Sequence, residues 1–143
     1  MKHTYVAKTS ISISASIEKV WEALVTPSII KQYLFGTEVT SDWKEDSTIT
    51  YTGVWKGKSY EDKGKILTFV PNKEFTATYW SSMSGTEDKP ENYAIVSYIL
   101  KTKDRHVELT VTQDNILNEA AQKDSKKNWG MVLGTIKKIV EEK

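Results

Sequence analysis

The last part of the chain, residues 118–142, limits the possible folds most strongly, because it is long, amphipathic and preceded by strand-like sequence. On a wheel of about 3.6 residues per turn, one side of this segment is apolar and the other is rich in lysine and glutamate. The side predicted to be buried carries Ser125, Trp129, Val132, Leu133, Ile136 and Val140. Such a helix needs an apolar surface to lie on, so we expect the upstream sequence to form a curved sheet.

The first part of the chain supplies one strand and two short helices. Residues 5–13 alternate polar and apolar side chains with period two, which predicts a half-buried strand. Residues 17–25 have apolar side chains at helical spacing, and Ser16 in front of them is a suitable N-cap. Pro27 begins a second helix, residues 27–34, because proline suits a first helical position and the residue before it avoids helical geometry.

The region from Val39 to Val111 is predicted to form about six strands joined by hairpins. Turns are expected at residues 55–58, 71–72 and 103–104, where glycine, asparagine and aspartate gather. Hairpin connections imply an antiparallel sheet, and helices on one of its faces imply an α+β fold.

One predicted strand contains a glycine, Gly64, at which the inward-facing positions change parity. Tyr60 and Asp62 are expected to point inward before the glycine, and Leu67 and Phe69 after it. This change predicts a β-bulge at Gly64 that bends the sheet.

Composition excludes several classes of protein. A chain of 143 residues is the size of a single domain, residues 1–143, and its 20 Lys and Arg against 19 Asp and Glu give no field that attracts nucleic acid or an anionic membrane. No cysteine is present, and no apolar run approaches the roughly 20 residues that cross a bilayer. The first residues also lack the apolar block of a signal peptide, so we expect a cytoplasmic protein.

The chain offers little for acid–base or metal chemistry. His3 lies near the terminus and His106 has outward strand parity, so both are expected on the surface, without a metal site or cofactor. Asp62 is the one candidate for catalysis, because a carboxylate that points inward can transfer protons. The alternative is that the strand register differs by one residue and Asp62 faces water.

Aromatic side chains are the more useful signal for binding. Inward-facing aromatic residues with polar tips fill cores, but they also line pockets for flat or acyl ligands. The residues that we expect to border such a pocket are Tyr51, Trp55, Tyr79, Tyr98, Trp129 and Leu133. Core packing alone is the alternative explanation.

Four stretches of the sequence together resemble a known family. They are ISISASIEKVWEALVTPSIIKQYLFGTEVTSDW (residues 11–43), GKILTFVPNKEF (64–75), LTVTQDN (109–115) and NWGMVLGTIKKIVEE (128–142). The chain resembles the bacterial stand-alone relatives of the activator of the heat-shock ATPase, in the START-like, birch-pollen-allergen-like (SRPBCC) superfamily. This resemblance implies a helix-grip fold, in which a seven-stranded antiparallel sheet wraps around a long C-terminal helix and two short helices follow strand 1.

The resemblance also carries expectations about function. The chain lacks the separate N-terminal domain of the eukaryotic co-chaperone, so we do not expect a full activator of the chaperone ATPase. We expect non-catalytic binding of a small hydrophobic or aromatic ligand between the sheet and the C-terminal helix, in a stress response as the resemblance implies. Two alternatives stay open. One is an interaction module that binds a chaperone or a second copy, and the other is a cyclase- or hydrolase-like enzyme that uses Asp62 with Tyr60 or Tyr79.

Two glycines, Gly130 and Gly134, interrupt the predicted C-terminal helix where many of these relatives carry a charged residue. Both lie off the apolar side of the helical wheel, so we interpret them as residues that lower helix stability locally and are tolerated on a solvent-exposed face. The alternative is a hinge that lets the helix lift from a cavity. Met131, on the outer face, hints at a surface contact.

Overall fold

A computed structural model describes residues 3–34, 36–82 and 84–142, with the backbone alone at Trp55. The described chain forms a seven-stranded antiparallel sheet with strand order β1-β7-β6-β5-β4-β3-β2. Its strands are β1 (Tyr5–Ile13), β2 (Glu38–Ser41), β3 (Thr48–Trp55), β4 (Lys58–Val70), β5 (Glu74–Tyr79), β6 (Ala94–Lys103) and β7 (His106–Ile116). Its helices are α1 (Ile17–Val25), α2 (Pro27–Tyr33), a 3-10 turn η1 (Pro90–Asn92) and α3 (Glu119–Glu141).

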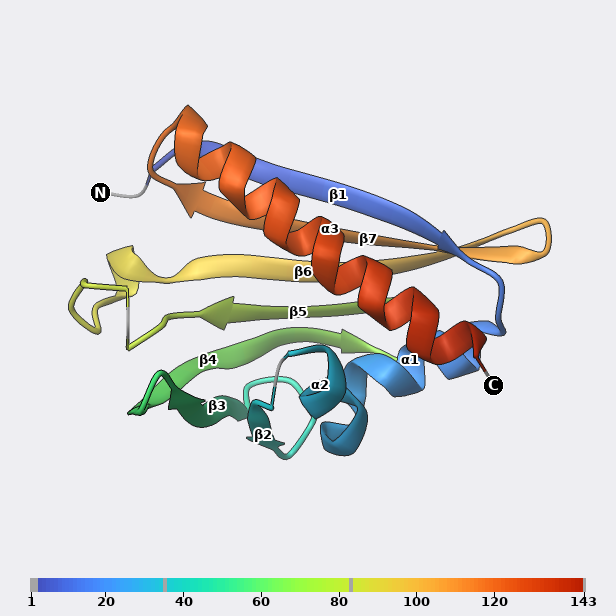
Figure 1. The fold of residues 1–143 in the computed structure, drawn as a ribbon, viewed down its shortest axis with the longest axis horizontal. Helices are drawn as coiled ribbons and strands as arrows, with labels where there is room; N and C mark the ends of the chain where they lie inside the picture. Colours follow the sequence, from blue (N-terminus) through green and yellow to red (C-terminus); the bar gives the residue numbers. More distant parts are fainter. Residues whose placement is uncertain (1–2, 35, 83, 143) are drawn as a thin grey trace.

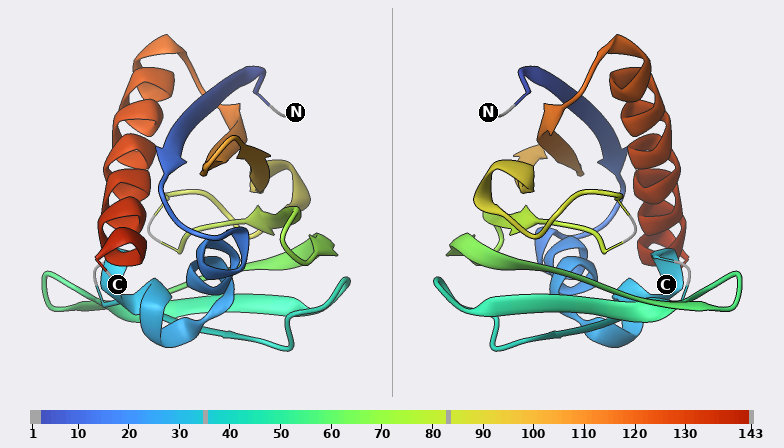
Figure 2. Two further views of the ribbon diagram at one scale, coloured as in Figure 1. Left: turned by 90° about the vertical axis from the view of Figure 1, so that its right-hand side faces the viewer. Right: turned by 90° about the vertical axis from the view of Figure 1, so that its left-hand side faces the viewer.

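The sheet and the long helix α3 form two layers that enclose the interior. Figure 1 shows α3 running diagonally across one face of the sheet, with α1 and α2 gathered near its C-terminal end. Seen along the sheet in Figure 2, the strands curve from β1 round to β2, and α3 closes the open side. This arrangement is the helix-grip α+β fold that the sequence predicted.

Local sequence explains where the two short helices begin and end. The hydroxyl of Ser16 accepts a hydrogen bond from the backbone N–H of Lys19 (3.2 Å), so it caps α1 as predicted. Helix α1 ends before Pro27, which opens α2 at its first position. The predicted bounds of α1 are confirmed, and α2 ends at Tyr33, one residue earlier than expected.

The bulge in β4 does not lie at Gly64, so that prediction is wrong. The register shifts between Ile66 and Thr68, and Leu67 is 42% exposed while Ile66 is fully buried. Gly64 serves a different purpose, because a Cβ atom there would lie 1.6 Å from the carbonyl oxygen of Thr78. The glycine therefore permits a close approach of two strands, and the change of parity follows three residues later. Phe69 packs inward as predicted.

Helix α3 is held to β1 by apolar packing and by hydrogen bonds at both ends. Leu133 and Ile136 are 0% exposed. Near the start of the helix, Gln122 donates its side-chain amide to the carbonyl oxygen of Val6 (2.6 Å). Near its end, Lys137 Nζ donates to the carbonyl oxygen of Ser12 at 2.8 Å. The helix is thus anchored along the whole length of the first strand.

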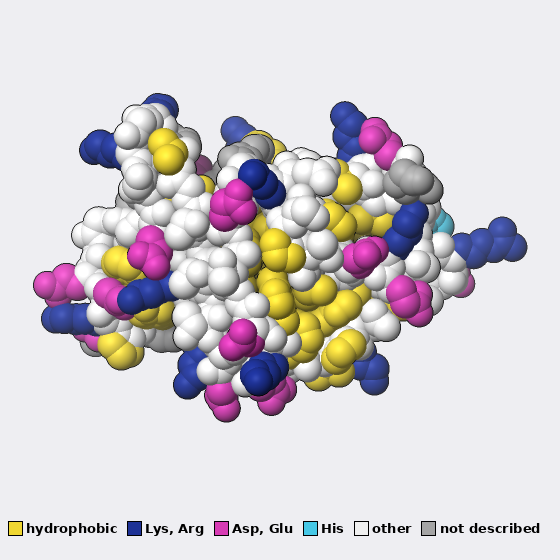
Figure 3. All heavy atoms as spheres, turned by 90° about the horizontal axis from the view of Figure 1, so that it is seen from below, with side chains coloured by type: hydrophobic (Ala, Val, Ile, Leu, Met, Phe, Trp, Pro, Cys, Tyr) yellow, Lys and Arg dark blue, Asp and Glu magenta, His cyan; other side chains and the backbone are white. Residues whose placement is uncertain are grey.

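The face of the molecule drawn in Figure 3 is mostly polar, and hydrophobic side chains gather on part of it. Figure 3 shows these side chains near the middle of the face seen from below, with charged groups around them. Met131 is 52% exposed on the outer side of α3, as the helical wheel predicted.

None of the described helices is both long enough and apolar enough to cross a membrane.

We predict that Gly130→Ala and Gly134→Ala each raise the free energy of unfolding by about 1 kcal/mol, measured by urea denaturation. A Cβ atom at either position meets nothing within 4 Å, so alanine adds helix propensity without a clash. Gly64→Ala is the contrasting control, and overpacking against Thr78 should lower stability by about 1–3 kcal/mol. Amide exchange at residues 130–134 as slow as at Ile136 would exclude the hinge.

Candidate functional site

A cavity of about 340 Å³ lies between α3 and the concave face of the sheet. Four consecutive strands, β3 to β6, form most of its wall, and β7, α3 and the segment after α2 complete it. Its lining residues are Leu34, Thr37, Tyr51, Val54, Tyr60, Asp62, Phe75, Ala77, Thr78, Tyr79, Val96, Tyr98, Gln113 and Trp129. The interior beneath Trp129 is therefore hollow.

Four of the six residues predicted to border a pocket lie on this wall: Tyr51, Tyr79, Tyr98 and Trp129. The side chain of Trp55 lies outside the described part of the chain, as does Phe35 in the stretch of residues 11–43 that carries the resemblance. Leu133 is a correction, because it is 0% exposed and packs in the core instead of lining the cavity. The cavity ends at the turn of α3 that carries Trp129, one turn before Leu133.

The aromatic side chains of the wall pack against one another. Tyr98 stacks on Phe75 with ring centroids 5.7 Å apart and meets the edge of Trp129 at 5.8 Å. Tyr51 and Tyr79 form a second, edge-to-face pair with ring centroids 5.5 Å apart. Each such pair stabilises the orientation of its rings beyond the gain from burial, so the wall is shaped before any ligand arrives.

Gln113, in β7, fixes the indole of Trp129. The Nε1–H group of Trp129 donates a hydrogen bond to Oε1 of Gln113 (2.8 Å), which satisfies the polar edge of the indole. We did not select Gln113 from the sequence. A signal was present, because Gln113 shares the parity of the buried residues Leu109 and Val111 and is the polar member of that inward row.

Asp62, in β4, is the charged residue of the wall. It is 8% exposed, so the prediction that it points inward is confirmed and the register that would expose it is excluded. Its carboxylate accepts hydrogen bonds from the hydroxyl of Tyr79 (2.5 Å) and from the backbone N–H of Ser82 (3.1 Å). Tyr51 lies directly opposite Asp62 in the β3–β4 register, so two tyrosines flank the carboxylate.

The environment keeps the wall tyrosines protonated. Burial raises the pKa of Tyr51, and the negative charge of Asp62 raises it further. Burial also raises the pKa of Tyr79, with further increases from its hydrogen bond to Asp62 and from the charge of that group. Burial raises the pKa of Tyr98. These hydroxyls therefore serve as hydrogen-bonding groups and not as bases near neutral pH.

Two of these hydroxyls are available to a guest molecule. Among the described residues, Tyr51 and Tyr98 have no hydrogen-bonding partner for their hydroxyls, and no fully buried side-chain polar atom lacks a partner. Both hydroxyls must therefore reach the open space of the cavity. A ligand with a suitably placed polar atom can bond to them.

One side of the mouth of the cavity is formed by a contact between Thr37 and Tyr60. The hydroxyl of Thr37 donates to the carbonyl oxygen of Leu34 (2.7 Å), so it accepts from the hydroxyl of Tyr60, also at 2.7 Å. Gly53 makes room for this ring, because a Cβ atom there would lie 2.5 Å from the Tyr60 hydroxyl. Val54 lines the cavity and is 69% exposed, which places the opening beside this contact.

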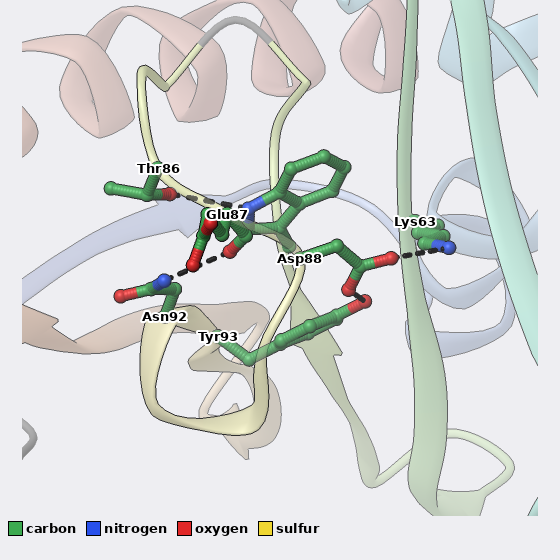
Figure 4. A network of polar contacts seen from close by, with 7 residues as sticks. Lys63, Thr86, Glu87, Asp88, Asn92 and Tyr93 are labelled. Atoms are coloured by element: carbon green, nitrogen blue, oxygen red, sulfur yellow. Dashed lines mark hydrogen bonds and ion pairs between the residues drawn. The ribbon is translucent and has the colours of Figure 1, made fainter.

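The loop of residues 81–92 helps to hold the Asp62 carboxylate in place. Besides the bond from Ser82 to Asp62, the hydroxyl of Ser82 accepts from the backbone N–H of Glu61 (3.0 Å). Farther along, Figure 4 shows Asp88 between Lys63 and Tyr93. The Asp88 carboxylate lies 2.6 Å from Lys63 Nζ and accepts from the Tyr93 hydroxyl at 2.5 Å.

The charges of this loop network shift the pKa values of its members. The hydrogen bonds from Lys63 and Tyr93 lower the pKa of Asp88. Burial and the bond to Asp88 raise the pKa of Tyr93 to about 12. The network is therefore fully formed around neutral pH, with Asp88 ionised and Tyr93 protonated.

The two histidines take no part in the site. His106 is exposed at the start of β7, as its strand parity predicted, and His3 is exposed near the N-terminus. Within residues 3–34, 36–82 and 84–142, no three His, Cys, Asp or Glu residues lie close enough together to hold a metal ion.

We predict that Asp88→Asn speeds amide exchange in residues 81–92, because the charge that attracts Lys63 is lost. Because the native pKa of Asp88 is lowered, its contribution is present above its ordinary pKa of 3.8 and lost as the pH falls through the lowered value. In strong acid the unmodified protein should show the same loss of protection in this loop, measured as the exchange rate relative to the intrinsic rate at that pH. Asp124→Asn, on the exposed side of α3, is the matched control, and equal exchange in both variants would contradict the prediction.

Comparison with known proteins places the chain in a family. The model of the family described as "Activator of Hsp90 ATPase homolog 1-like protein" matches residues 14–141. A protein of Cytophaga hutchinsonii, solved in solution, is 47% identical, with a TM-score of 0.88 over 99% of this chain and 97% of that chain. No protein with a curated description matches the chain significantly.

More distant solved structures share the fold. The Aha1 dimer from Colwellia psychrerythraea is 21% identical, with a TM-score of 0.75 over 96% of each chain. A Mesorhizobium loti protein is 18% identical, with a TM-score of 0.77 over 96% of this chain and 98% of that chain. At these identities the likeness is one of fold alone. The family match and the Cytophaga relative show more: the chain belongs to the Activator of Hsp90 ATPase homolog 1-like family, of the SRPBCC type.

Proposed function

We propose that this protein binds a small, largely apolar molecule in the cavity between the sheet and α3, without transforming it chemically. The observation that carries the proposal is the cavity itself. Its volume of about 340 Å³ reaches the range of roughly 300–1,000 Å³ in which small-molecule sites fall. A protein that used these aromatic residues only as core would have filled that space, because interiors pack to the density of organic crystals.

The composition of the wall supports the same function. Rings and aliphatic side chains form most of it, and few polar groups interrupt them. They include the Asp62 carboxylate, the free hydroxyls of Tyr51 and Tyr98 and the Gln113 amide. The hydroxyls of four further lining residues already bond within the protein: Thr37, Tyr60, Thr78 and Tyr79. An apolar wall supplies affinity, and a few placed polar groups orient the guest, as in binding sites generally.

An enzymatic function remains the second candidate, because Asp62 meets Tyr79 inside the cavity. A cyclase- or hydrolase-like reaction would need such a pair to move a proton. The raised pKa of Tyr79 makes that hydroxyl a weak acid and favours a binding role. Turnover of any bound compound that Asp62→Asn abolishes would establish the enzyme instead.

A chaperone-linked role in stress rests on the family name alone. The family is described by its likeness to an activator of the Hsp90 ATPase. Under this proposal, ligand occupancy of the cavity would accompany contact with a chaperone. Pull-down with and without a saturating ligand would test this extension separately from binding itself.

We predict saturable binding of the neutral fluorescent probe N-phenyl-1-naphthylamine, with a shift of the Trp129 indole N–H signal in NMR spectra. Ala77→Phe should abolish both effects, because Ala77 is a buried wall residue of β5 and a ring there would occupy the cavity.

The control is Val140→Ala, a core change at the far end of α3 that leaves the cavity wall intact. It should lower stability but keep probe binding. Probe binding that survives Ala77→Phe unchanged in a folded variant would overturn the proposed function.

A further inference from the structure

The described wall of the cavity carries a negative charge and no positive charge to balance it. Among the described residues, this wall contains one carboxylate, Asp62, and no Lys, Arg or His side chain. The ion pairs found among the described residues do not include Asp62, and the neighbouring Lys63 is paired with Asp88 instead. A buried carboxylate without a counter-ion is costly, and two hydrogen bonds from Tyr79 and Ser82 offset only part of that cost. The cavity therefore has a place for a positive charge.

The aromatic side chains next to Asp62 favour the same kind of guest. Tyr79 donates to the carboxylate, and Tyr51 lies opposite it in the strand register. Ring faces carry negative electrostatic potential and attract ammonium groups, most strongly when water is excluded. A cation beside Asp62 would thus gain from the carboxylate and from the rings together.

An anionic guest meets the opposite situation. None of the described residues of the wall offers it a cationic side chain, and Asp62 would repel it across a medium of low dielectric constant. A neutral guest could bond to the free hydroxyls of Tyr51 and Tyr98 but would leave the charge of Asp62 unpaired. The order of preference follows from these contacts: cation, neutral molecule, anion.

We propose that the cavity selects a free small molecule with a protonated amine head and an apolar body, and that the ammonium group binds the Asp62 carboxylate. This inference rests on the proposed function, since it names the class of ligand for the same cavity. The size of the cavity and the contact of Thr37 with Tyr60 at its mouth favour a free small molecule over a segment of another protein.

The test uses three compounds with one body and different heads: 4-phenylbutylamine, 4-phenylbutanol and 4-phenylbutanoate. At neutral pH the amine should bind about tenfold to a hundredfold more tightly than the alcohol, as expected for a hydrogen bond to a charged group, and the carboxylate should bind most weakly. Isothermal titration calorimetry gives the affinities, and the Trp129 indole signal shows that each compound occupies the cavity.

Two variants assign the preference to its cause. Asp62→Asn should bring the ratio of amine to alcohol affinity close to one, whereas Asp124→Asn, which removes an exposed carboxylate, should leave that ratio unchanged. The measurement on the unmodified protein needs no variant, so it decides the matter even if Asp62→Asn fails to fold.

The outcomes separate this inference from the proposed function. Equal affinity for the amine and the alcohol, with both shifting the Trp129 signal, would overturn the amine preference and leave ligand binding intact. Failure of all three compounds and of the neutral probe to bind would overturn both.

Discussion

The packing of α3 against β1 is the contact on which the rest of the structure depends. Leu133 and Ile136 are completely buried there, and side-chain hydrogen bonds from Gln122 and Lys137 hold the two ends of the helix to the same strand. The helix is fixed to the edge strand and runs diagonally across one face of the sheet (Figure 1). A cavity remains between the helix and that face. The cavity is the space left beneath the turn of Trp129, between the helix and strands β3 to β7.

A cavity and a buried charge both lower the free energy of unfolding, and contacts around them offset part of that loss. The rings of Tyr98, Phe75 and Trp129 brace one another, so the wall keeps its shape without a guest. The 81–92 loop supplies a backbone N–H to Asp62, and its own anchor on Lys63 keeps that donor in place. A cavity that is kept open by its surroundings is typical of a binding site, because binding sites commonly lower the stability of a protein.

The family relationship and the cavity contribute different kinds of information. Proteins 18–21% identical to this chain share its fold, so the sheet and helix tolerate wide changes in sequence. Layer packing needs only apolar residues at the right period, which many sequences provide. The ligand depends on particular side chains at particular points of the wall, and these must be taken from this chain alone.

The sequence by itself determined the elements, their order and the parity of most strands, because helical and strand periodicity, caps and proline breaks act over a few residues. It therefore placed α1, Asp62 and four of the wall aromatic residues correctly. Only the tertiary structure decided where the β4 bulge lies, that Leu133 packs in the core, and that Gln113 orients the indole. Those outcomes depend on how closely distant segments approach, and local periodicity does not contain that distance.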